Sequence, residues 1–382
     1  MSQHLFLASG IFHPDSGGPA TYLYSLAPAL IQKGWQVRVQ AFGEMNQDDQ
    51  AYPYPVKRIP RRFYPIRQVD YWRQAKEALK WADLLYIHSS ELALPKTKVP
   101  KILKVVGDGS WERAIRKGWI APLTDIDAYQ DGTDSKRATF DRKRRDRRLQ
   151  GMDGIIVPSH YLKRMAMGWG IEEKRIKVIY NALPAQESQL DLTQEAARNL
   201  LGIAPDASVL FTAARLNPWK GVDTIIEALR SLKGIDLYIA GDGSELPHLR
   251  ALAADMGKQV TFLGRIDRQQ VALYMKACDY FILYSGYEGL AHSLLESLRE
   301  GSPVIASDKG GNPEVVEDGV NGLLAPYQDV DALKVCIEKA FETGLRERLA
   351  SHSQSSLAKF SFETMVKETD QTLLQYLKGT AG

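Results

Sequence analysis

The chain has 382 residues, 44% of them hydrophobic, and a formal net charge of +3 at pH 7. This length and hydrophobic content predict a globular protein with two domains. The small net charge gives no reason to expect attraction of the whole molecule to nucleic acid.

Neither a leader peptide nor a membrane span is expected. The first residues lack a basic leader, and no run approaches the roughly 18 apolar residues of a membrane-spanning helix. Cys278 and Cys336 lie in apolar surroundings, which predicts buried thiols in a reducing compartment. Without a cluster of Cys or His, no metal site is expected. We expect a cytoplasmic protein, with peripheral contact at the inner face of the membrane as a further option.

Strand-like apolar runs alternate with helical patterns along the whole chain. Strands are expected at residues 5–8, 36–42, 84–88, 102–106, 154–158, 176–180, 209–213, 236–240, 259–263, 280–284 and 303–306. Helical spacing lies between most of them, as at residues 22–33, 222–232 and 269–277. Such alternation predicts an α/β protein with parallel sheets covered on both faces.

Too many strands are expected for one sheet, so we divide the chain. Residues 182–192 are polar and contain proline, as a linker does. The predicted domains are residues 1–183 and 184–360. Residues 361–382 have helical spacing with no following strand, and fit as a cap on either domain.

A glycine-rich loop at residues 10–19 joins the first expected strand to the first helix. Gly17 and Gly18 let the backbone approach a ligand closely, and Pro19 suits a first helical turn. Such loops are common in α/β proteins, so this one predicts little by itself.

Asp108 follows the expected strand at residues 102–106 and lies between two glycines. Ligands of open parallel sheets bind at the carboxyl ends of the strands, which favours a ligand contact. A turn aspartate that accepts hydrogen bonds from its own backbone fits equally well. Both interpretations stay open.

A run of cations extends from Lys136 to Arg148, interrupted by two aspartates. On a helix these cations surround the axis, and a solvated helix is the slightly favoured interpretation. The alternative is contact with anionic lipid headgroups or with a pyrophosphate-linked acceptor.

Arg215 and Lys220 lie between the strand at 209–213 and the next helix. A lysine at a helix start is electrostatically unfavourable unless an anion neutralises it. Arginine adds a planar fork that matches phosphate oxygens. Together the two cations can stabilise a departing diphosphate without a metal ion.

Glu288 and Glu296 frame a run of backbone amides between the strand at 280–284 and the following helix. The amides of Gly289, Leu290 and Ala291, with the positive end of the helix, favour an anion. Glu296 also fits a capping box with Ser293, and capping is the favoured interpretation of that residue alone. Glu288 lies outside the helix, where no cap requires it.

Two further loops are weak signals. Gly241 and Gly243 follow a strand and precede a helix, where their loop could contact a nucleotide. The loop after an ordinary central strand has the same glycines. Arg265 and Ile266 offer a cation and backbone groups to a base.

Taken together, these motifs resemble the retaining glycosyltransferases of family 4, which have the GT-B fold. The resemblance extends over nearly the whole chain. It is most specific in residues 215–220, 241–243, 288–296 and 310–314, where Gly310 and Gly311 precede Glu314.

The resemblance implies two Rossmann-like domains facing a cleft that holds a nucleotide sugar, and a last helix that crosses back to the N-terminal domain. It implies that Arg215 and Lys220 hold the diphosphate, Glu288 contacts the sugar and Glu296 binds the ribose. The base is expected near Arg265 and Ile266, and Gly17 and Gly18 are expected to approach from the opposite domain.

One departure concerns Asp108. Many members of that family carry a sugar-contacting histidine after the corresponding strand, so the sugar-contact role of Asp108 is less secure than the others. The expected reaction is hexose transfer to a glycan or lipid-linked glycan with retained anomeric configuration, and with neither metal nor cofactor. Rival hypotheses are a nucleotide-sugar 2-epimerase, a dehydrogenase without the usual dinucleotide fingerprint, and a non-catalytic nucleotide-sugar-binding protein.

Overall fold

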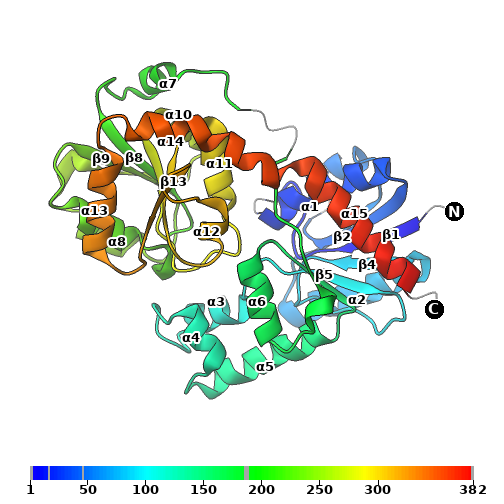
Figure 1. Cartoon of the computed structure of the whole chain (residues 1–382). Coiled ribbons are helices and arrows are strands. Elements are labelled where there is room, and N and C mark those ends of the chain that lie inside the picture. Colours follow the sequence, from blue (N-terminus) through cyan, green and yellow to red (C-terminus); the bar gives the residue numbers. More distant parts are fainter. Residues whose placement is uncertain (1–2, 16–17, 45–46, 185–188, 380–382) are drawn as a thin grey trace. The chain divides into compact units, whose positions relative to one another are not determined.

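The computed structural model describes residues 3–15, 18–44, 47–184 and 189–379. Tertiary contacts divide the chain into two compact units, each built on a parallel sheet (Figure 1). Unit 1 comprises Met1–Ser110, Lys136–Gln186 and Phe362–Gly382. Unit 2 comprises Trp111–Ser135 and Glu187–Ser361.

The sheet of unit 1 has seven parallel strands in the order β3-β2-β1-β4-β5-β6-β7. Its strands are β1 (Gln3–Ala8), β2 (Trp35–Phe42), β3 (Val56–Ile59), β4 (Leu84–Ile87), β5 (Lys101–Lys104), β6 (Gly154–Val157) and β7 (Ile176–Val178). Its helices are α1 (Gly18–Gln32), η1 (Gln47–Gln50), α2 (Tyr64–Trp81), α5 (Lys136–Gln150), α6 (His160–Gly168), η2 (Glu173–Arg175) and α15 (Phe362–Gly379), while α3 (Gly109–Arg116) begins in unit 1 and continues into unit 2.

The sheet of unit 2 has six parallel strands in the order β10-β9-β8-β11-β12-β13. Its strands are β8 (Ser208–Ala213), β9 (Ile235–Ala240), β10 (Val260–Gly264), β11 (Tyr280–Leu283), β12 (Val304–Ser307) and β13 (Gly322–Ala325). Its helices are α4 (Ile126–Asp131), α7 (Gln194–Leu201), η3 (Pro218–Lys220), α8 (Val222–Leu229), α9 (Leu246–Leu252), η4 (Gly257–Gln259), α10 (Arg268–Ala277), α11 (His292–Glu300), α12 (Asn312–Val315), α13 (Val330–Ala340), α14 (Leu345–Ser353) and η5 (Ser355–Phe360).

Helices cover both faces of each sheet. In unit 1, Leu5 and Leu7 of β1 pack in one core with residues of α1 and α15. On the other face, the ring of Phe42 lies 4.9 Å from that of Tyr71 in α2. Alternate strand residues thus meet different helices, as the two-residue period of a strand requires. Helix α15 is tied to unit 1 by a 2.7 Å hydrogen bond from Trp35 Nε1 to Asp370 Oδ1.

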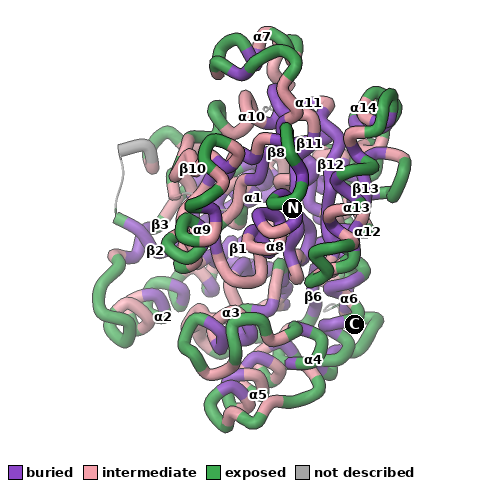
Figure 2. Tube along the Cα trace, turned by 90° about the vertical axis from the view of Figure 1, so that its left-hand side faces the viewer, coloured by how far each residue is buried: buried purple, intermediate pink, exposed green. Residues whose placement is uncertain are grey.

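In unit 2, alternate strand residues also contact helices on opposite faces of the sheet. Ile282 of β11 belongs to a core with residues of α8 and α13. Its neighbour Phe281 faces the other side with Phe211, whose ring stacks 5.2 Å from Tyr274 of α10. The strands of this sheet run through the buried interior of the unit (Figure 2). The predicted class, α/β with two parallel sheets, is therefore confirmed.

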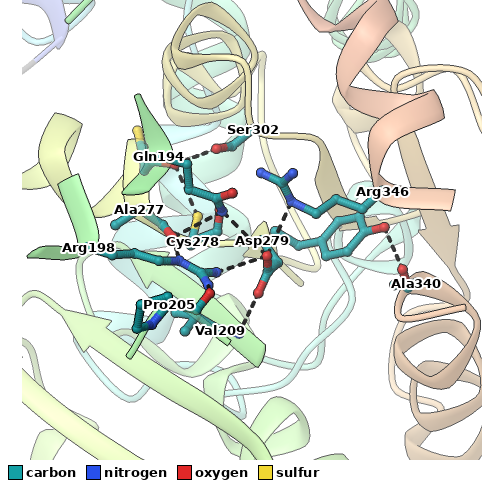
Figure 3. A network of polar contacts seen from close by, with 12 residues as sticks. Gln194, Arg198, Pro205, Val209, Ala277, Cys278, Asp279, Ser302, Ala340 and Arg346 are labelled. Carbon is teal, nitrogen blue, oxygen red and sulfur yellow. Dashed lines mark hydrogen bonds and ion pairs between the residues drawn. The ribbon is translucent and has the colours of Figure 1, made fainter. Parts of the chain in front are cut away.

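A buried polar network fastens α7 to the sheet of unit 2 (Figure 3). Arg198 of α7 lies 2.9 Å from the Asp279 carboxylate and also donates to the backbone oxygens of Ala277 and Pro205. The same carboxylate accepts from the Val209 amide at 2.8 Å and lies 3.2 Å from Arg346. One carboxylate therefore connects α7, the residue Val209 of β8, and α14.

Candidate functional site

Five loops meet at the carboxyl edge of the unit 2 sheet, where ligands of open α/β sheets bind. Backbone hydrogen bonds join them in pairs. The Leu216 amide donates to Asp242 at 3.0 Å, and the Gly241 amide donates to Gly264 at 2.7 Å. The Gly286 amide donates to Trp219 at 2.8 Å. The predicted site residues that follow β8, β9, β10 and β11 thus lie in one connected rim.

Glycine is required where these loops touch. A Cβ on Gly241, whose φ is 127°, would lie 1.9 Å from the Ala214 carbonyl oxygen. A Cβ on Gly311 would lie 2.5 Å from the Gly289 carbonyl oxygen, and its amide donates to Glu288 at 2.8 Å. The loops at residues 241–243 and 310–311 therefore brace the neighbouring loops, whatever ligand they also meet.

Lys220 and Glu288 form an ion pair across this rim. Lys220 Nζ lies 2.5 Å from Glu288 Oε1, and each side chain is 16% exposed. Glu288 supplies the negative charge that the sequence argument assigned to a bound anion at the start of α8. The cation at that helix start is thus balanced within the chain, and a ligand would have to exchange partners with Glu288 or Lys220.

Arg215 adds a cation at the same edge of the sheet. It follows β8 by two residues and is exposed. Within the part of the chain that the structure describes, its side chain makes no hydrogen bond or ion pair. A guanidinium in this state is available to an anion.

Helix α11 begins without a side-chain cap. It starts at His292, its N-cap is Ala291, and no side chain accepts a hydrogen bond at the cap. Ser293 lies inside the helix, so the predicted capping box of Ser293 with Glu296 is wrong. Gly289, Leu290 and Ala291 are buried ahead of the helix, and their segment brings the positive end of the dipole to the rim.

Glu296 and Arg265 lie at the outer part of the rim. Glu296 is one turn inside α11, with Oε1 3.6 Å from Arg268 Nη2. Arg265 is 83% exposed on the loop after β10 and lies 3.2 Å from Asp242, while Ile266 beside it is half-buried. Gly243 belongs to the same loop as Asp242.

The structure also shows an aromatic cluster, two members of which are sequence neighbours of the ion pair. Trp111 is buried, and its ring lies 4.9 Å from Trp219 and 5.5 Å from Tyr287. These last two residues immediately precede Lys220 and Glu288. The adjacency of each aromatic ring to a charged residue was the available signal, because packed rings fix the backbone that carries the charge.

Two of the three predicted site residues of unit 1 are described by the structure, and one of them, Asp108, is buried. Asp108 is fully buried, and its carboxylate pairs with Arg145 of α5 and accepts from the Ser110 amide at 3.0 Å. It thus makes the turn contact left open by the sequence, together with an ion pair that the sequence did not suggest. Gly18 is the exposed first residue of α1, and Gly17 lies outside the described residues.

The two cysteines provide no reactive thiol. Burial raises the pKa of both Cys278 and Cys336 to about 12, so these thiols are protonated and unreactive at neutral pH. Over the described residues, no three His, Cys, Asp or Glu side chains come together as a metal site would require. No helix in the described ranges is both long and apolar enough to cross a membrane.

The sequence matches two family models. Residues 16–187 match Glycosyltransferase Family 4, and residues 193–355 match Glycosyl transferases group 1. Together the two matches cover most of the chain, which therefore belongs to these glycosyltransferases, as the motifs predicted.

Curated relatives and solved structures agree with this assignment. A lipopolysaccharide core biosynthesis glycosyltransferase from Rhizobium meliloti is 34% identical over 44% of this chain and 50% of its own length. The alpha-monoglucosyldiacylglycerol synthase of Streptococcus pneumoniae is 29% identical over 58% of this chain and 52% of its own. The aligned part of the chain spans about half the length of these relatives.

Two solved structures match nearly the whole chain. A sucrose-phosphate synthase from Thermosynechococcus elongatus has a TM-score of 0.76 at 21% identity, covering 99% of this chain and 100% of its own. The Anabaena protein HepE, solved in complex with UDP-glucose, has a TM-score of 0.76 at 20% identity, covering 98% and 100%. These likenesses show the fold, which is GT-B.

Proposed function

We propose that this protein transfers a hexose from a nucleoside diphosphate sugar to an acceptor hydroxyl, with retention of the anomeric configuration. The observation that carries this proposal is the Lys220–Glu288 ion pair beside Arg215 and the uncapped start of α11. Two cations, a carboxylate and a positive helix end within one rim suit a diphosphate joined to a sugar.

Each rim residue has a role in this proposal. Arg215 and Lys220 neutralise the diphosphate, with the amides at residues 289–291 as further donors. Glu288, released from Lys220 when the diphosphate binds, accepts hydrogen bonds from the hydroxyls of the sugar. Glu296 accepts from the ribose, and Arg265 with Ile266 contacts the base at the outer loops, beside Gly241 and Gly243. The UDP-glucose in the HepE complex supports this donor class.

The reaction follows from these placements. The bond between the anomeric carbon and the diphosphate oxygen breaks, and the acceptor oxygen bonds to the same face of that carbon. The acceptor proton passes to an oxygen of the leaving diphosphate, whose charge Lys220 and Arg215 stabilise. Because those cations do the neutralising, the proposal includes no metal ion.

The acceptor in this proposal is a glycan or a lipid-linked glycan. By their names, the relatives given above act in lipopolysaccharide core biosynthesis and in the synthesis of alpha-monoglucosyldiacylglycerol. Asp108 is not assigned a sugar contact, because its carboxylate is buried against Arg145. Its role in the proposal is to position the chain after β5.

A ligand screen followed by product analysis tests the proposal. UDP, GDP and ADP sugars are compared by thermal shift, where one tight donor is expected to raise the melting temperature. The stabilising donor is then incubated with and without EDTA, and with and without candidate acceptors. Retention in the product and insensitivity to EDTA are expected. No stabilisation by any donor would contradict the proposal, and an epimerised sugar formed without acceptor would identify an epimerase instead.

A further inference from the structure

Residues 111–135 connect β5 to α5 of unit 1, but they pack in unit 2. They contain most of α3 and all of α4. Trp111 is the first of them, and its ring lies 4.9 Å from that of Trp219 and 5.5 Å from that of Tyr287. These two aromatic residues immediately precede the two members of the ion pair in the chain. One ring from the first half of the sequence therefore contacts the neighbours of both charged residues.

The side chain of Trp111 is held in one orientation. It is 2% exposed, and its Nε1 donates to the Thr124 carbonyl at 3.0 Å. The next residue, Asp125, caps α4 by accepting from the amides of Asp127 and Ala128. Because the polar atom of the indole is satisfied by a segment that is itself fixed, the ring is a rigid element beside the ion pair.

On the Lys220 side, this ring contact adds to a set of backbone hydrogen bonds. The Trp219 carbonyl accepts from the Gly286 amide at 2.8 Å. The Lys220 amide donates to the Asn217 carbonyl at 3.0 Å. Hydrogen bonds thus fix the backbone of Trp219, and Trp111 fixes its side chain. The backbone from which Lys220 extends is held by both.

On the Glu288 side, the loop is packed closely as well. Tyr287 is 4% exposed, and its ring is edge-on to Trp111, with an angle of 70° between the planes. The Glu288 carbonyl accepts from the Gly311 amide at 2.8 Å, and a Cβ on Gly310 would lie 2.6 Å from the same oxygen. This loop is therefore held by residues 310–311 and, through Tyr287, by Trp111.

The packing of Trp111 concerns the site more than the core. The core of unit 2 formed with α8 and α13 does not include Trp111 among its described members. The side chains of Lys220 and Glu288 are long and flexible, so their spacing depends on the backbone that carries them. A displacement of about 1 Å at a reacting group can cost about 100-fold in rate. A ring that fixes both loops is thus expected to affect catalysis without touching the donor.

We propose that Trp111 is a positioning residue of the donor site, whose ring holds Lys220 and Glu288 at the spacing from which they exchange partners with the donor. This role rests on the proposed function, which supplies the roles of the two charged residues. It deepens that function by assigning part of the donor site to residues 111–135, which precede β8 in the chain.

Steady-state kinetics of ring variants give the first test. Trp111→Ala is expected to lower kcat about 100-fold, because the two charged side chains lose their fixed spacing. Trp111→Phe keeps a ring at this position and should stay within about tenfold of wild type. Phe341→Ala is the matched control, since its half-buried ring lies 5.6 Å from that of Tyr280 at the amino end of β11, away from the rim.

The control Phe341→Ala should keep kcat within about twofold of wild type. A loss as large as that of Trp111→Ala would mean that any lost ring lowers kcat by general destabilisation, and the positioning role would be wrong. A kcat of Trp111→Ala within about twofold of wild type would contradict it directly.

A double-mutant cycle shows whether Trp111 acts through the ion pair. In a Lys220→Ala background, Trp111→Ala should lower kcat by at most about tenfold more, which is the part that acts through Glu288. Independent effects would multiply, and the double variant would then lie about 100-fold below Lys220→Ala. That result would overturn the positioning role while leaving the role of Lys220 in sugar transfer intact.

Amide hydrogen exchange tests the same contacts without a reaction. In the unliganded protein, the amides of Lys220, Gly286 and Gly311 are expected to exchange about tenfold faster in Trp111→Ala, and at wild-type rates in Phe341→Ala. Unchanged exchange in Trp111→Ala, or an equal increase in Phe341→Ala, would overturn the positioning role whatever reaction the protein catalyses. Faster exchange in Trp111→Ala alone, with no stabilising donor in the ligand screen, would support the role of Trp111 in the rim and contradict only the proposed function.

Discussion

At the scale of single residues, the proposed chemistry depends on Lys220 and Glu288 changing partners. In the structure the two side chains form an ion pair, with 2.5 Å between Lys220 Nζ and Glu288 Oε1, and each side chain is 16% exposed. A partly buried pair of this kind holds both side chains in place until a ligand with a charge of its own arrives. When the donor binds, Lys220 would pair with the diphosphate, and Glu288 would accept hydrogen bonds from the sugar hydroxyls.

Lys220→Ala should lower kcat by about 10²–10³, because a charge that stabilises the leaving diphosphate is lost from a preorganised site. The cost in folding stability should be about 1–3 kcal/mol, since Glu288 loses a partner while half-buried. Steady-state kinetics and urea unfolding measure the two effects. Lys233→Ala, an exposed lysine of the same unit, is the control. A kcat within twofold of wild type at saturating donor would exclude the role.

Lys104 is a second residue whose charge state matters, in the core of unit 1. It is buried, donates to the Ile179 carbonyl at 3.2 Å and lies over the Tyr22 ring, with His88 close enough to interact. Burial lowers the pKa of its ammonium to about 7 from 10.5. The folded state therefore binds fewer protons than the unfolded state between about pH 7 and 10.5.

The free energy of unfolding of unit 1 should consequently rise with pH through that window, since the cost of burying the charged form is fully present only below about pH 7. Lys104→Met should be more stable than wild type by on the order of 3 kcal/mol at pH 6. The difference should shrink toward pH 10. Urea unfolding at pH 6, 8 and 10 measures it. A difference that does not depend on pH would show that the wild-type ammonium is not destabilised.

At the scale of elements, the interior strands and two of the four edge strands, β7 and β10, were predictable from the sequence. Each strand run expected from the sequence is a strand, because strands covered on both faces consist of continuous apolar residues. The sequence analysis missed β3 and β13, which lie at the edges of their sheets. In β3, Lys57 and Arg58 interrupt the apolar pattern, and β13 is a four-residue strand that begins at Gly322.

At the candidate site, local motifs were predictable from the sequence and long-range contacts were not. Motif residues that follow interior strands, such as Arg215 and Glu288, could be singled out as candidates in the sequence because their chemistry is unusual for a loop. Contacts between distant residues were not predictable. The partner of Asp108 is Arg145 on α5, 37 residues later, and Glu288 itself neutralises Lys220, 68 residues before it. Helix boundaries mattered as well, since a start at His292 removes Ser293 from the cap position.

The anchoring of α7 gives a prediction at this scale. Arg198→Ala should destabilise unit 2 by about 1–3 kcal/mol, because the partly buried Asp279 carboxylate keeps Arg346 but loses this donor, as do two carbonyl oxygens. Arg230→Ala, which breaks the exposed pair with Asp255, should cost far less stability, because solvent screens such a pair. Chemical denaturation of both variants makes the comparison. Similar losses in the two would show that α7 is not held by this network.

At the scale of the whole molecule, two separate cores predict two cooperative transitions. The core of unit 1 includes residues of α1 and α15, and the core of unit 2 includes residues of α8 and α13. Because the chain leaves unit 1 and returns to it through α15, unit 1 combines residues from both ends of the sequence. Removing α15 should therefore destabilise unit 1, although α15 follows unit 2 in the chain.

The two transitions can be assigned with variants already named. In scanning calorimetry, Arg198→Ala should lower only the transition of unit 2, and Lys104→Met should raise only that of unit 1. A donor at about 100 times its Kd should raise the unit 2 transition by the equivalent of about 2.7 kcal/mol, since the proposed donor contacts lie on its rim. If both variants and the donor moved one common transition, the units would unfold together. If the donor moved only the unit 1 transition, the rim residues Arg215, Lys220 and Glu288 would not be its binding site.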